Sequence, residues 1–142
     1  MSPLPEYARP TRRMRAGTVG EALVADYVVG LGWTILGRNV RVGRSELDLV
    51  AVDPGPPALL VVVEVRANRT SRFGLPEESV DRDKLRAVYR GAVALRTMGR
   101  LPDGTRLPRL PLRVDVVSVE LAPRLGHGLD GTVLRHLRGV IG

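Results

Sequence analysis

The sequence of 142 residues contains no cysteine, a single lysine and few aromatic residues. The absence of cysteine excludes disulfides, thiolate zinc sites and cysteine nucleophiles, and it is typical of a cytoplasmic protein. The scarcity of aromatic side chains argues against a surface that stacks unpaired bases. No apolar run approaches the roughly 20 residues that cross a bilayer, and residues 1–14 lack the apolar core of a signal peptide. We therefore expect one cytoplasmic domain.

Positive charge, in contrast, is abundant: the formal net charge is +7 and the isoelectric point is near 11.1. Such a balance favours a polyanionic partner, and DNA or RNA first of all. Of the 22 basic residues only Lys84 is a lysine, and this uniform use of arginine is also typical of a GC-rich genome. Residues 1–16 are expected to form a disordered basic arm, which either follows phosphates or is simply solvated.

The apolar pattern predicts an α/β domain spanning residues 17–142. Thr18 and Glu21 match a capping box, which would begin a helix that ends near Gly30. The remaining elements follow in the order strand, strand, strand, helix, strand, at about 33–40, 45–52, 59–66, 79–98 and 112–121. The helix before the last strand permits a parallel crossover, so a mixed β-sheet flanked by helices is expected. Residues 132–137 fit either a strand or a helical turn.

The second predicted helix is amphipathic. Ser79 is expected to cap it, and its apolar stripe consists of Leu85, Val88, Ala92 and Leu95.

The second and third predicted strands carry acidic residues where a buried strand should be apolar. Strand alternation places Glu46 and Asp48 on one face and Leu47 and Leu49 on the other. Charge inside a strand is costly to bury unless it is paired or binds a metal. The pattern therefore marks this strand as a candidate site.

The third strand adds Glu64 and Arg66 on one of its faces. A hairpin through residues 53–57 would bring the acids of both strands and Arg66 to one point. Three carboxylates and a guanidinium in one place suit a divalent cation and a phosphate.

These motifs, in this order, resemble the YraN family, a group of bacterial proteins described mainly as predicted and endonuclease-like. The wider resemblance is to the restriction-endonuclease-like superfamily, whose signature PD-(D/E)xK has an acid on the second strand and Glu or Asp followed by Lys on the third. The matching pieces are Gly20-Glu21, Arg38-Asn39-x-Arg41, Glu46-Leu47-Asp48-Leu49, Val63-Glu64-Val65-Arg66, Phe73-Gly74, Ser79-Val80-Asp81-x-x-Lys84 and Arg113-Val114-Asp115.

The resemblance implies a nuclease that cleaves phosphodiesters with Mg²⁺ or Mn²⁺. Asp48 and Glu64 would be the main ligands, with the Val65 carbonyl and Glu46 as further ones. Arg66 stands where the superfamily has lysine. An arginine stays protonated and cannot act as a base, although it can hold a phosphate.

The resemblance also implies a substrate. The order of motifs is similar to that of archaeal resolvases, which implies structured DNA rather than RNA, and a homodimer on a two-fold substrate. The rival interpretations are a non-catalytic nucleic-acid-binding module with a degenerate site, and a protein–protein adaptor.

Several individual residues keep two interpretations. Glu46 is either a third carboxylate of the site or a residue at the solvated entry of its strand. Asp48 and Glu64 would form a metal site or simple salt bridges with Arg66 and Arg41. Glu21 completes the site from the first helix or only caps that helix, and Lys84 reaches the site or is a surface lysine. The arginines that would contact nucleic acid or be solvated are Arg41, Arg44, Arg69 and Arg72.

Asp115 is expected to pair with Arg113 at a sheet edge, and no role is expected for His127 or His136. A zinc site is not expected.

Overall fold

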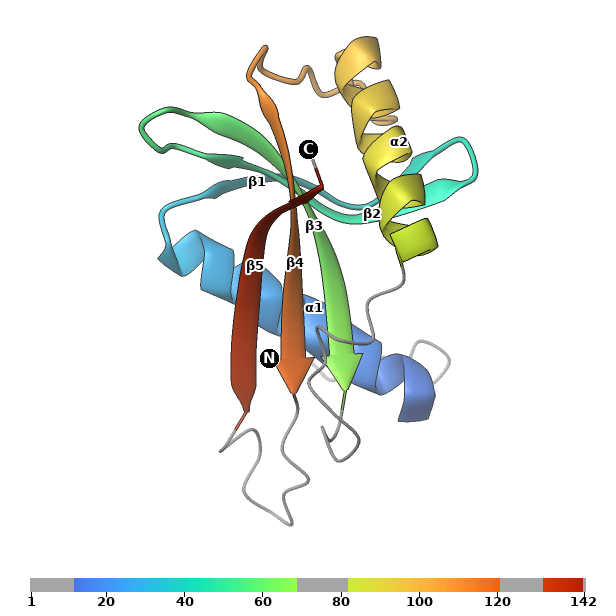
Figure 1. Cartoon of the computed structure of the whole chain (residues 1–142), viewed down its shortest axis with the longest axis vertical. Helices are drawn as coiled ribbons and strands as arrows, with labels where there is room; N and C mark the ends of the chain where they lie inside the picture. The colour runs from blue at the N-terminus through green and yellow to red at the C-terminus, as the bar shows by residue number, and fades with distance from the viewer. Residues whose placement is uncertain (1–11, 69–81, 121–131, 142) are drawn as a thin grey trace.

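The computed structural model describes residues 12–68, 82–120 and 132–141, which form a sheet between two helices (Figure 1). The elements are α1 (Arg12–Gly30), β1 (Thr34–Val42), β2 (Ser45–Asp53), β3 (Leu59–Asn68), α2 (Arg82–Met98), β4 (Leu112–Glu120) and β5 (Val133–Ile141). The predicted order of helix, three strands, helix and strand is confirmed. The open question about residues 132–137 is settled in favour of a strand, β5. In this part of the chain no helix is long and apolar enough to span a membrane.

The five strands form one mixed sheet in the order β1-β2-β3-β4-β5. The β2–β3 hairpin is antiparallel, as predicted, and β3 pairs with β4 in parallel. Because α2 lies between β3 and β4 in the chain, it forms the crossover that a parallel pair requires. The first strand β1 and the last strand β5 close the two edges in antiparallel pairing.

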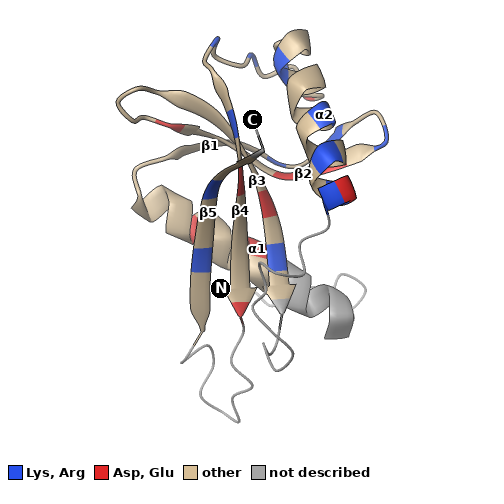
Figure 2. Cartoon of the chain, in the orientation of Figure 1, with Lys and Arg blue, Asp and Glu red and all other residues tan. Residues whose placement is uncertain are grey.

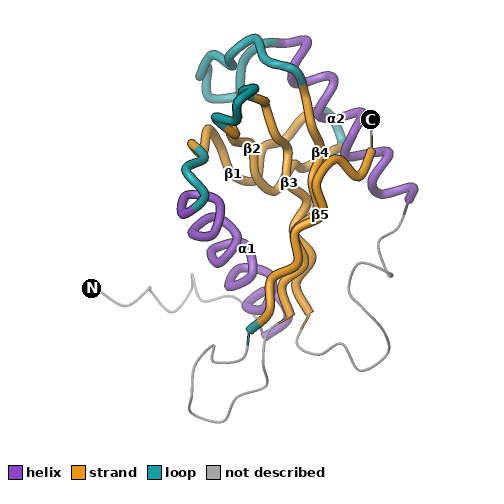
Figure 3. The backbone as a smooth tube through the Cα atoms, turned by 60° about the vertical axis from the view of Figure 1, so that its left-hand side comes forward, coloured by secondary structure: helices purple, strands orange, loops and turns teal. Residues whose placement is uncertain are grey.

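Each helix covers one face of the sheet (Figure 3). On the α1 side, Val24 and Val28 pack with Val61 and Val63 of β3. On the α2 side lies a second core, and the buried residues of α2 are Leu85, Val88, Gly91, Ala92 and Leu95. The apolar stripe predicted for this helix is confirmed.

Two glycines allow the helices to approach the sheet closely. A Cβ atom on Gly20 would lie 2.6 Å from the Cβ of Ala67 on β3, and a Cβ atom on Gly91 would lie 3.0 Å from that of Ser45 on β2. Any larger side chain at either position would push the helix away from the strand beneath it. The glycines therefore fix the distance at which the side chains of α1 and α2 meet the sheet.

The start of α1 differs from the prediction. The helix begins at Arg12 rather than at Thr18, so the predicted capping box is wrong. Residues 12–16, predicted as part of a disordered arm, belong to the helix. The segment before Gly17 consists of arginine, methionine and alanine, which are good helix formers, and none of them stops the helix from extending.

The predicted alternation along β2 is also wrong at one point. Leu47 packs in the core on the α2 side, whereas Leu49 packs in the core on the α1 side. On a regular strand, residues two positions apart lie on the same face. The first half of β2 pairs with β1 alone, since its pairing with β3 begins at Leu49. A two-stranded ribbon twists more strongly than a wider sheet, and the break in alternation falls at Asp48.

A buried polar network joins β4 to β5. Asp115 has no exposed surface, and it accepts hydrogen bonds from Nε and Nη2 of Arg113, at 2.8 and 2.9 Å, and from the Gly139 N–H at 3.0 Å. His136 Nε2 lies 2.8 Å from Oδ2 of the same carboxylate, and His136 Nδ1 lies 2.9 Å from the Tyr27 hydroxyl of α1. The predicted Arg113–Asp115 pair is confirmed, but its predicted place at a sheet edge is wrong, because β4 lies between β3 and β5. The expectation of no role for His136 is wrong, whereas His127 lies outside the described residues.

The hydrogen bonds of this network determine the charge of Asp115. Burial alone would raise its pKa, but the hydrogen bonds from His136, Arg113 and Gly139 outweigh burial and hold the pKa below its usual value. Arg113 also pairs with Asp53 at 3.1 Å. The network thus holds an ionised carboxylate inside the protein and ties β5 to α1 and β4.

We expect Asp115→Ala to lower the free energy of unfolding by about 3–5 kcal/mol, because it removes a fully buried carboxylate that compensates the half-buried Arg113 and accepts hydrogen bonds from His136 and Gly139. Urea denaturation at pH 7 measures this loss. Asp83→Ala is the control, since the Asp83 side chain is 89% exposed, and it should change stability by less than about 0.5 kcal/mol. The folded pKa of Asp115 is lowered, so its contribution is present above pH 4 and disappears in acid, where the two proteins should converge. Equal stability at pH 7 would contradict the prediction.

Candidate functional site

The candidate site lies at a fork where β2 and β3 separate. The paired residues of these strands run from Asp53 and Leu59 to Leu49 and Val63, whereas β3 continues beside β4 as far as Asn68. The next residue on β2 is Asp48, and the next on β3 is Glu64. The strand geometry therefore brings the two predicted acids together just beyond the last pair.

Asp48 takes the place of a missing strand partner. Its Oδ2 accepts a hydrogen bond from the Val65 N–H at 2.8 Å, a donor that would otherwise be left without a partner where β2 turns away. The N–H and C=O groups of one strand residue point toward the same neighbour. The Val65 carbonyl therefore faces the same fork, on the side of Asp48.

Glu64 of β3 forms an ion pair with a lysine of α2. Its side chain is only 4% exposed, and its Oε1 lies 3.1 Å from Lys84 Nζ near the start of α2. A buried carboxylate needs a partner of opposite charge, and in this fold α2 provides one. Of the two interpretations of Lys84, the structure supports the one in which it reaches the site.

The surroundings of Asp48 favour its protonated form. Burial and, next, the neighbouring Glu64 carboxylate raise the pKa of Asp48 to about 7. The Val65 N–H and Lys84 act in the opposite direction but do not offset the increase. Asp48 therefore retains its proton up to near neutral pH, because a second negative charge beside Glu64 is costly in a partly buried place. A cation bound between them would remove that cost.

A cavity of about 180 Å³ opens beside Asp48. It is lined by Glu21, Ala22, Arg38, Asn39, Asp48, Leu49 and Val65. Burial, then the charges of Asp48 and Glu46, raise the pKa of Glu21. Because α1 begins at Arg12, Glu21 lies inside the helix and the interpretation as a capping residue is wrong. The structure places its carboxyl group at the site from the α1 side.

Arg38 and Asn39 of β1 also line this cavity, although the sequence reasoning did not include them among the site residues. Asn39 has a φ of 50°, in the left-handed region that asparagine tolerates better than most residues. It is flanked by the pairs Val40–Leu47 and Arg38–Leu49, so it lies beside Asp48. Asparagine is rare within strands, and its presence in the Arg38-Asn39 motif was the signal that could have identified it.

The structure does not bring every predicted residue into the fork. Glu46 pairs with Arg41 at 3.6 Å near the exposed end of the β1–β2 hairpin, so the expected convergence of three carboxylates is wrong. Arg41 therefore has a partner other than Asp48 or Glu64. Arg44 is exposed in the turn after β1, and Arg66 is half-buried on β3 beside Ser118 of β4. Arg69, Arg72 and the predicted Ser79 cap lie outside the described residues.

Within the described residues, no three acidic or histidine side chains lie close enough to hold a metal ion by themselves. The oxygens available at the fork itself come from the carboxylates of Asp48 and Glu64 and from the Val65 carbonyl, and Glu21 adds a carboxyl group in the adjoining cavity.

Comparison with known proteins gives a family. The model of the uncharacterised protein family UPF0102 matches residues 20–119, which include the elements from α1 to β4. The chain belongs to UPF0102. This confirms the family that the motifs predicted.

Relatives of similar length carry the same family name. A UPF0102 protein of Symbiobacterium thermophilum is 40% identical over 109 residues, covering 77% of this chain and 85% of the relative. That of Dehalococcoides mccartyi is 36% identical over 116 residues, covering 80% and 88%. That of Mycolicibacterium gilvum is 36% identical over 132 residues, covering 93% and 98%. All three carry the family name without an activity.

The raised pKa of Asp48 predicts a pH-dependent stability. Between its unfolded pKa near 3.8 and its folded pKa of about 7, the native state binds more protons than the unfolded chain at this group. The group's contribution to the free energy of unfolding therefore falls as pH rises from about 4 to about 7. Asp48→Asn should remove this decline, so the variant gains stability relative to wild type on going from pH 5 to pH 7.5.

Urea denaturation in EDTA at the two pH values tests this, with Asp83→Asn on the exposed start of α2 as the control. If the wild type and Asp48→Asn respond to pH in parallel, the assignment is wrong.

Proposed function

We propose that this protein is a metal-dependent nuclease that cleaves phosphodiesters of structured DNA at the fork between β2 and β3. The observation that supports this best is the half-buried Asp48 beside the buried Glu64, with the pKa of Asp48 raised to about 7. Two adjoining acids that retain a proton in the absence of a cation are suited to binding one. The order of the family motifs and the net charge of +7 point to nucleic acid as the substrate.

The donor set fits Mg²⁺ or Mn²⁺. Mg²⁺ is commonly bound by one or two protein carboxylates together with water and substrate phosphates. Asp48, Glu64 and the Val65 carbonyl would hold the ion, so a third acid is not required. When bound, such an ion supplies a water of lowered pKa and neutralises charge on the phosphoryl oxygens.

The chain's own residues provide the remaining groups. Lys84 stands beside Glu64 and compensates for the lysine that the superfamily has at the position of Arg66, because an amine can orient or deprotonate a water whereas a guanidinium stays charged. Arg38, in the cavity beside Asp48, offers the paired donors that a phosphate accepts. A homodimer and a branched substrate rest on the resemblance to resolvases alone.

One observation favours a second function. Arg66 in the lysine position is also what a nucleic-acid-binding module with a degenerate site would carry. Such a module would bind DNA with a steep dependence on salt but would not cleave it.

We expect the wild type to cleave DNA in Mg²⁺ or Mn²⁺ and Asp48→Ala and Glu64→Gln to lose at least about a hundredfold in rate, since each removes a carboxylate that would hold the metal ion. The measurement is cleavage of labelled linear duplex, single strand, flap, four-way junction and RNA by the three proteins purified in parallel. Mn²⁺ should also raise the melting temperature of the wild type but not that of Asp48→Ala. Equal cleavage by all three would indicate a contaminant, and binding without cleavage would favour the second function.

Lys84 and Arg66 should differ in their contributions. We expect Lys84→Gln to lower kcat by about a hundredfold or more while leaving substrate binding within a few-fold, as for loss of a group acting on the attacking water. Arg86→Gln is the matched control, because Arg86 is an exposed cation on the same helix that pairs with Asp83. Single-turnover cleavage and binding in EDTA separate the two effects. If Lys84→Gln weakens binding with no change in kcat, Lys84 only attracts the substrate.

A further inference from the structure

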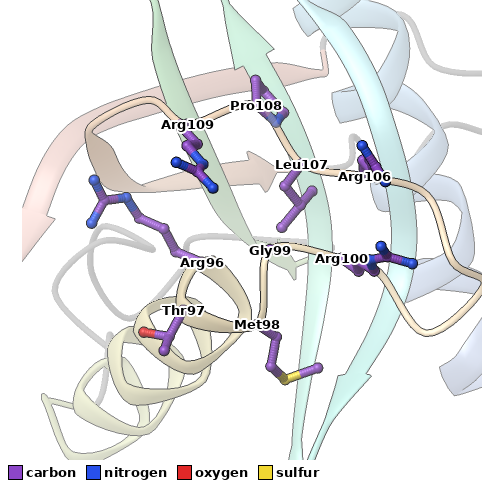
Figure 4. Close-up of a pocket in the computed structure, with 9 residues that line it drawn as sticks. All are labelled: Arg96, Thr97, Met98, Gly99, Arg100, Arg106, Leu107, Pro108 and Arg109. Carbon is purple, nitrogen blue, oxygen red and sulfur yellow. The ribbon is translucent and has the colours of Figure 1, made fainter.

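A pocket rich in arginine lies at the far end of α2, away from the fork (Figure 4). Its volume is about 720 Å³, and it is lined by Arg96, Thr97, Met98, Gly99, Arg100, Arg106, Leu107, Pro108 and Arg109. Figure 4 shows Arg96 and Arg109 on one side of the pocket and Arg100 and Arg106 on the other. Four guanidinium groups thus surround one hollow.

The backbone that carries these side chains is firmly held. Gly99, with a φ of 71°, ends α2, and its N–H donates to the Leu95 carbonyl at 2.9 Å. The loop that follows closes on itself through an antiparallel bridge between Arg100 and Arg106 and a hydrogen bond from the Leu107 N–H to the Gly99 carbonyl at 2.9 Å. Leu107 is buried beneath the loop, so the arginines project from a fixed frame.

The charges of the pocket are not balanced within the described residues. No carboxylate there pairs with any of the four arginines, and the acid of the same loop, Asp103, accepts the Thr105 N–H instead. Arg96 donates through Nε to the Leu110 carbonyl, and its position in the last turn of α2 also suits the helix dipole.

That dipole explanation does not extend to Arg100 and Arg106, which lie beyond the helix. They sit directly opposite each other in the bridge, an arrangement of like charges that is unfavourable without an anion.

We propose that this arginine pocket binds a backbone phosphate of the same nucleic acid that is cleaved at Asp48 and Glu64. The proposal rests on the proposed function and adds a second contact with the substrate. Guanidinium groups bind phosphate oxygens in pairs and remain charged at every physiological pH. The exposure of the four arginines leaves them accessible to the backbone of a long polyanion.

Helix α2 sets the spacing between the two contacts. Arg96 follows Lys84 by twelve residues. At a rise of 1.5 Å per residue, their positions are separated by about 18 Å along the helix axis. This corresponds to about five base pairs along a duplex, at 3.4 Å per pair. Figure 2 marks basic residues along the ribbon of this helix, and they are Arg82, Lys84, Arg86, Arg90 and Arg96. A duplex lying along α2 would meet positive charge from the fork to the arginine pocket.

The test measures binding of a labelled 24-base-pair duplex in EDTA, where the proposed cleavage cannot proceed, from 50 to 200 mM salt. We expect Arg100→Gln/Arg106→Gln to weaken binding about tenfold or more and to reduce the slope of log affinity against log salt by about 2. Arg106→Gln alone should show part of this loss. Arg138→Gln is its matched control, because Arg138 is an exposed arginine on β5, and it should change binding by less than about twofold.

A series of duplexes from 6 to 24 base pairs sharpens the test. The wild type should gain affinity once the duplex spans both contacts, and the double variant should lose that step. Melting temperatures of all variants show whether each is folded.

The possible outcomes separate this proposal from the proposed function. If the double variant binds like wild type, or if Arg138→Gln loses as much as Arg106→Gln, the pocket is not a specific contact, and cleavage by the wild type leaves the nuclease proposal intact. If the wild type neither binds nor cleaves any substrate, both proposals fail together. A selective loss in the double variant together with cleavage by the wild type supports the proposal. The same loss without cleavage overturns the link to a cleaved substrate and leaves the pocket as a DNA contact of the non-catalytic module.

Discussion

The hydrogen bond from the Val65 N–H to Asp48 is the interaction on which the candidate site depends. Where β2 leaves β3, a buried backbone donor loses its strand partner, and an unsatisfied group of this kind costs about 1–3 kcal/mol. Asp48 satisfies it with a carboxylate oxygen at 2.8 Å. The divergence of β2 from β3 therefore allows an acid, Asp48, within a strand. The same divergence leaves room for Glu64 of β3 to approach Asp48.

The two helices complete the fork from opposite faces of the sheet, and they bring opposite charges. From α1, Glu21 reaches the cavity beside Asp48, while from α2, Lys84 reaches Glu64. The close approach of α1 at Gly20, next to Glu21, and of α2 at Gly91 fixes these distances. Negative charge thus accumulates on the side of α1, and positive charge lies on the side of α2, where a polyanion would be attracted.

Sequence patterns predicted those features of the fold and site that depend on residues close together in the chain. The apolar stripe of α2, the β2–β3 hairpin and the presence of Asp48 and Glu64 at one point all followed from periodicity and turn residues. The opposite faces of Leu47 and Leu49 did not, because the twist of the β1–β2 ribbon sets them. His136 was missed because its partner Tyr27 is 109 positions away, and no local pattern joins a hydroxyl in the first helix to the last strand.

The same sheet holds the buried Asp115 and the half-buried Asp48 in opposite electrostatic states, and the difference indicates which of them is available to a ligand. Asp115 accepts four hydrogen bonds, and its pKa is lowered, so its charge is already compensated by the protein. Asp48 has one backbone donor and a neighbouring acid, and its pKa is raised to about 7. Since both residues are acids on central strands, the number of donors around each carboxylate separates a structural role from a candidate binding role. The arginine pocket at the far end of α2 has the opposite imbalance, an excess of positive charge. A polyanion that spans the pocket and the fork would neutralise the arginines and would place its phosphates beside Asp48 and Glu64.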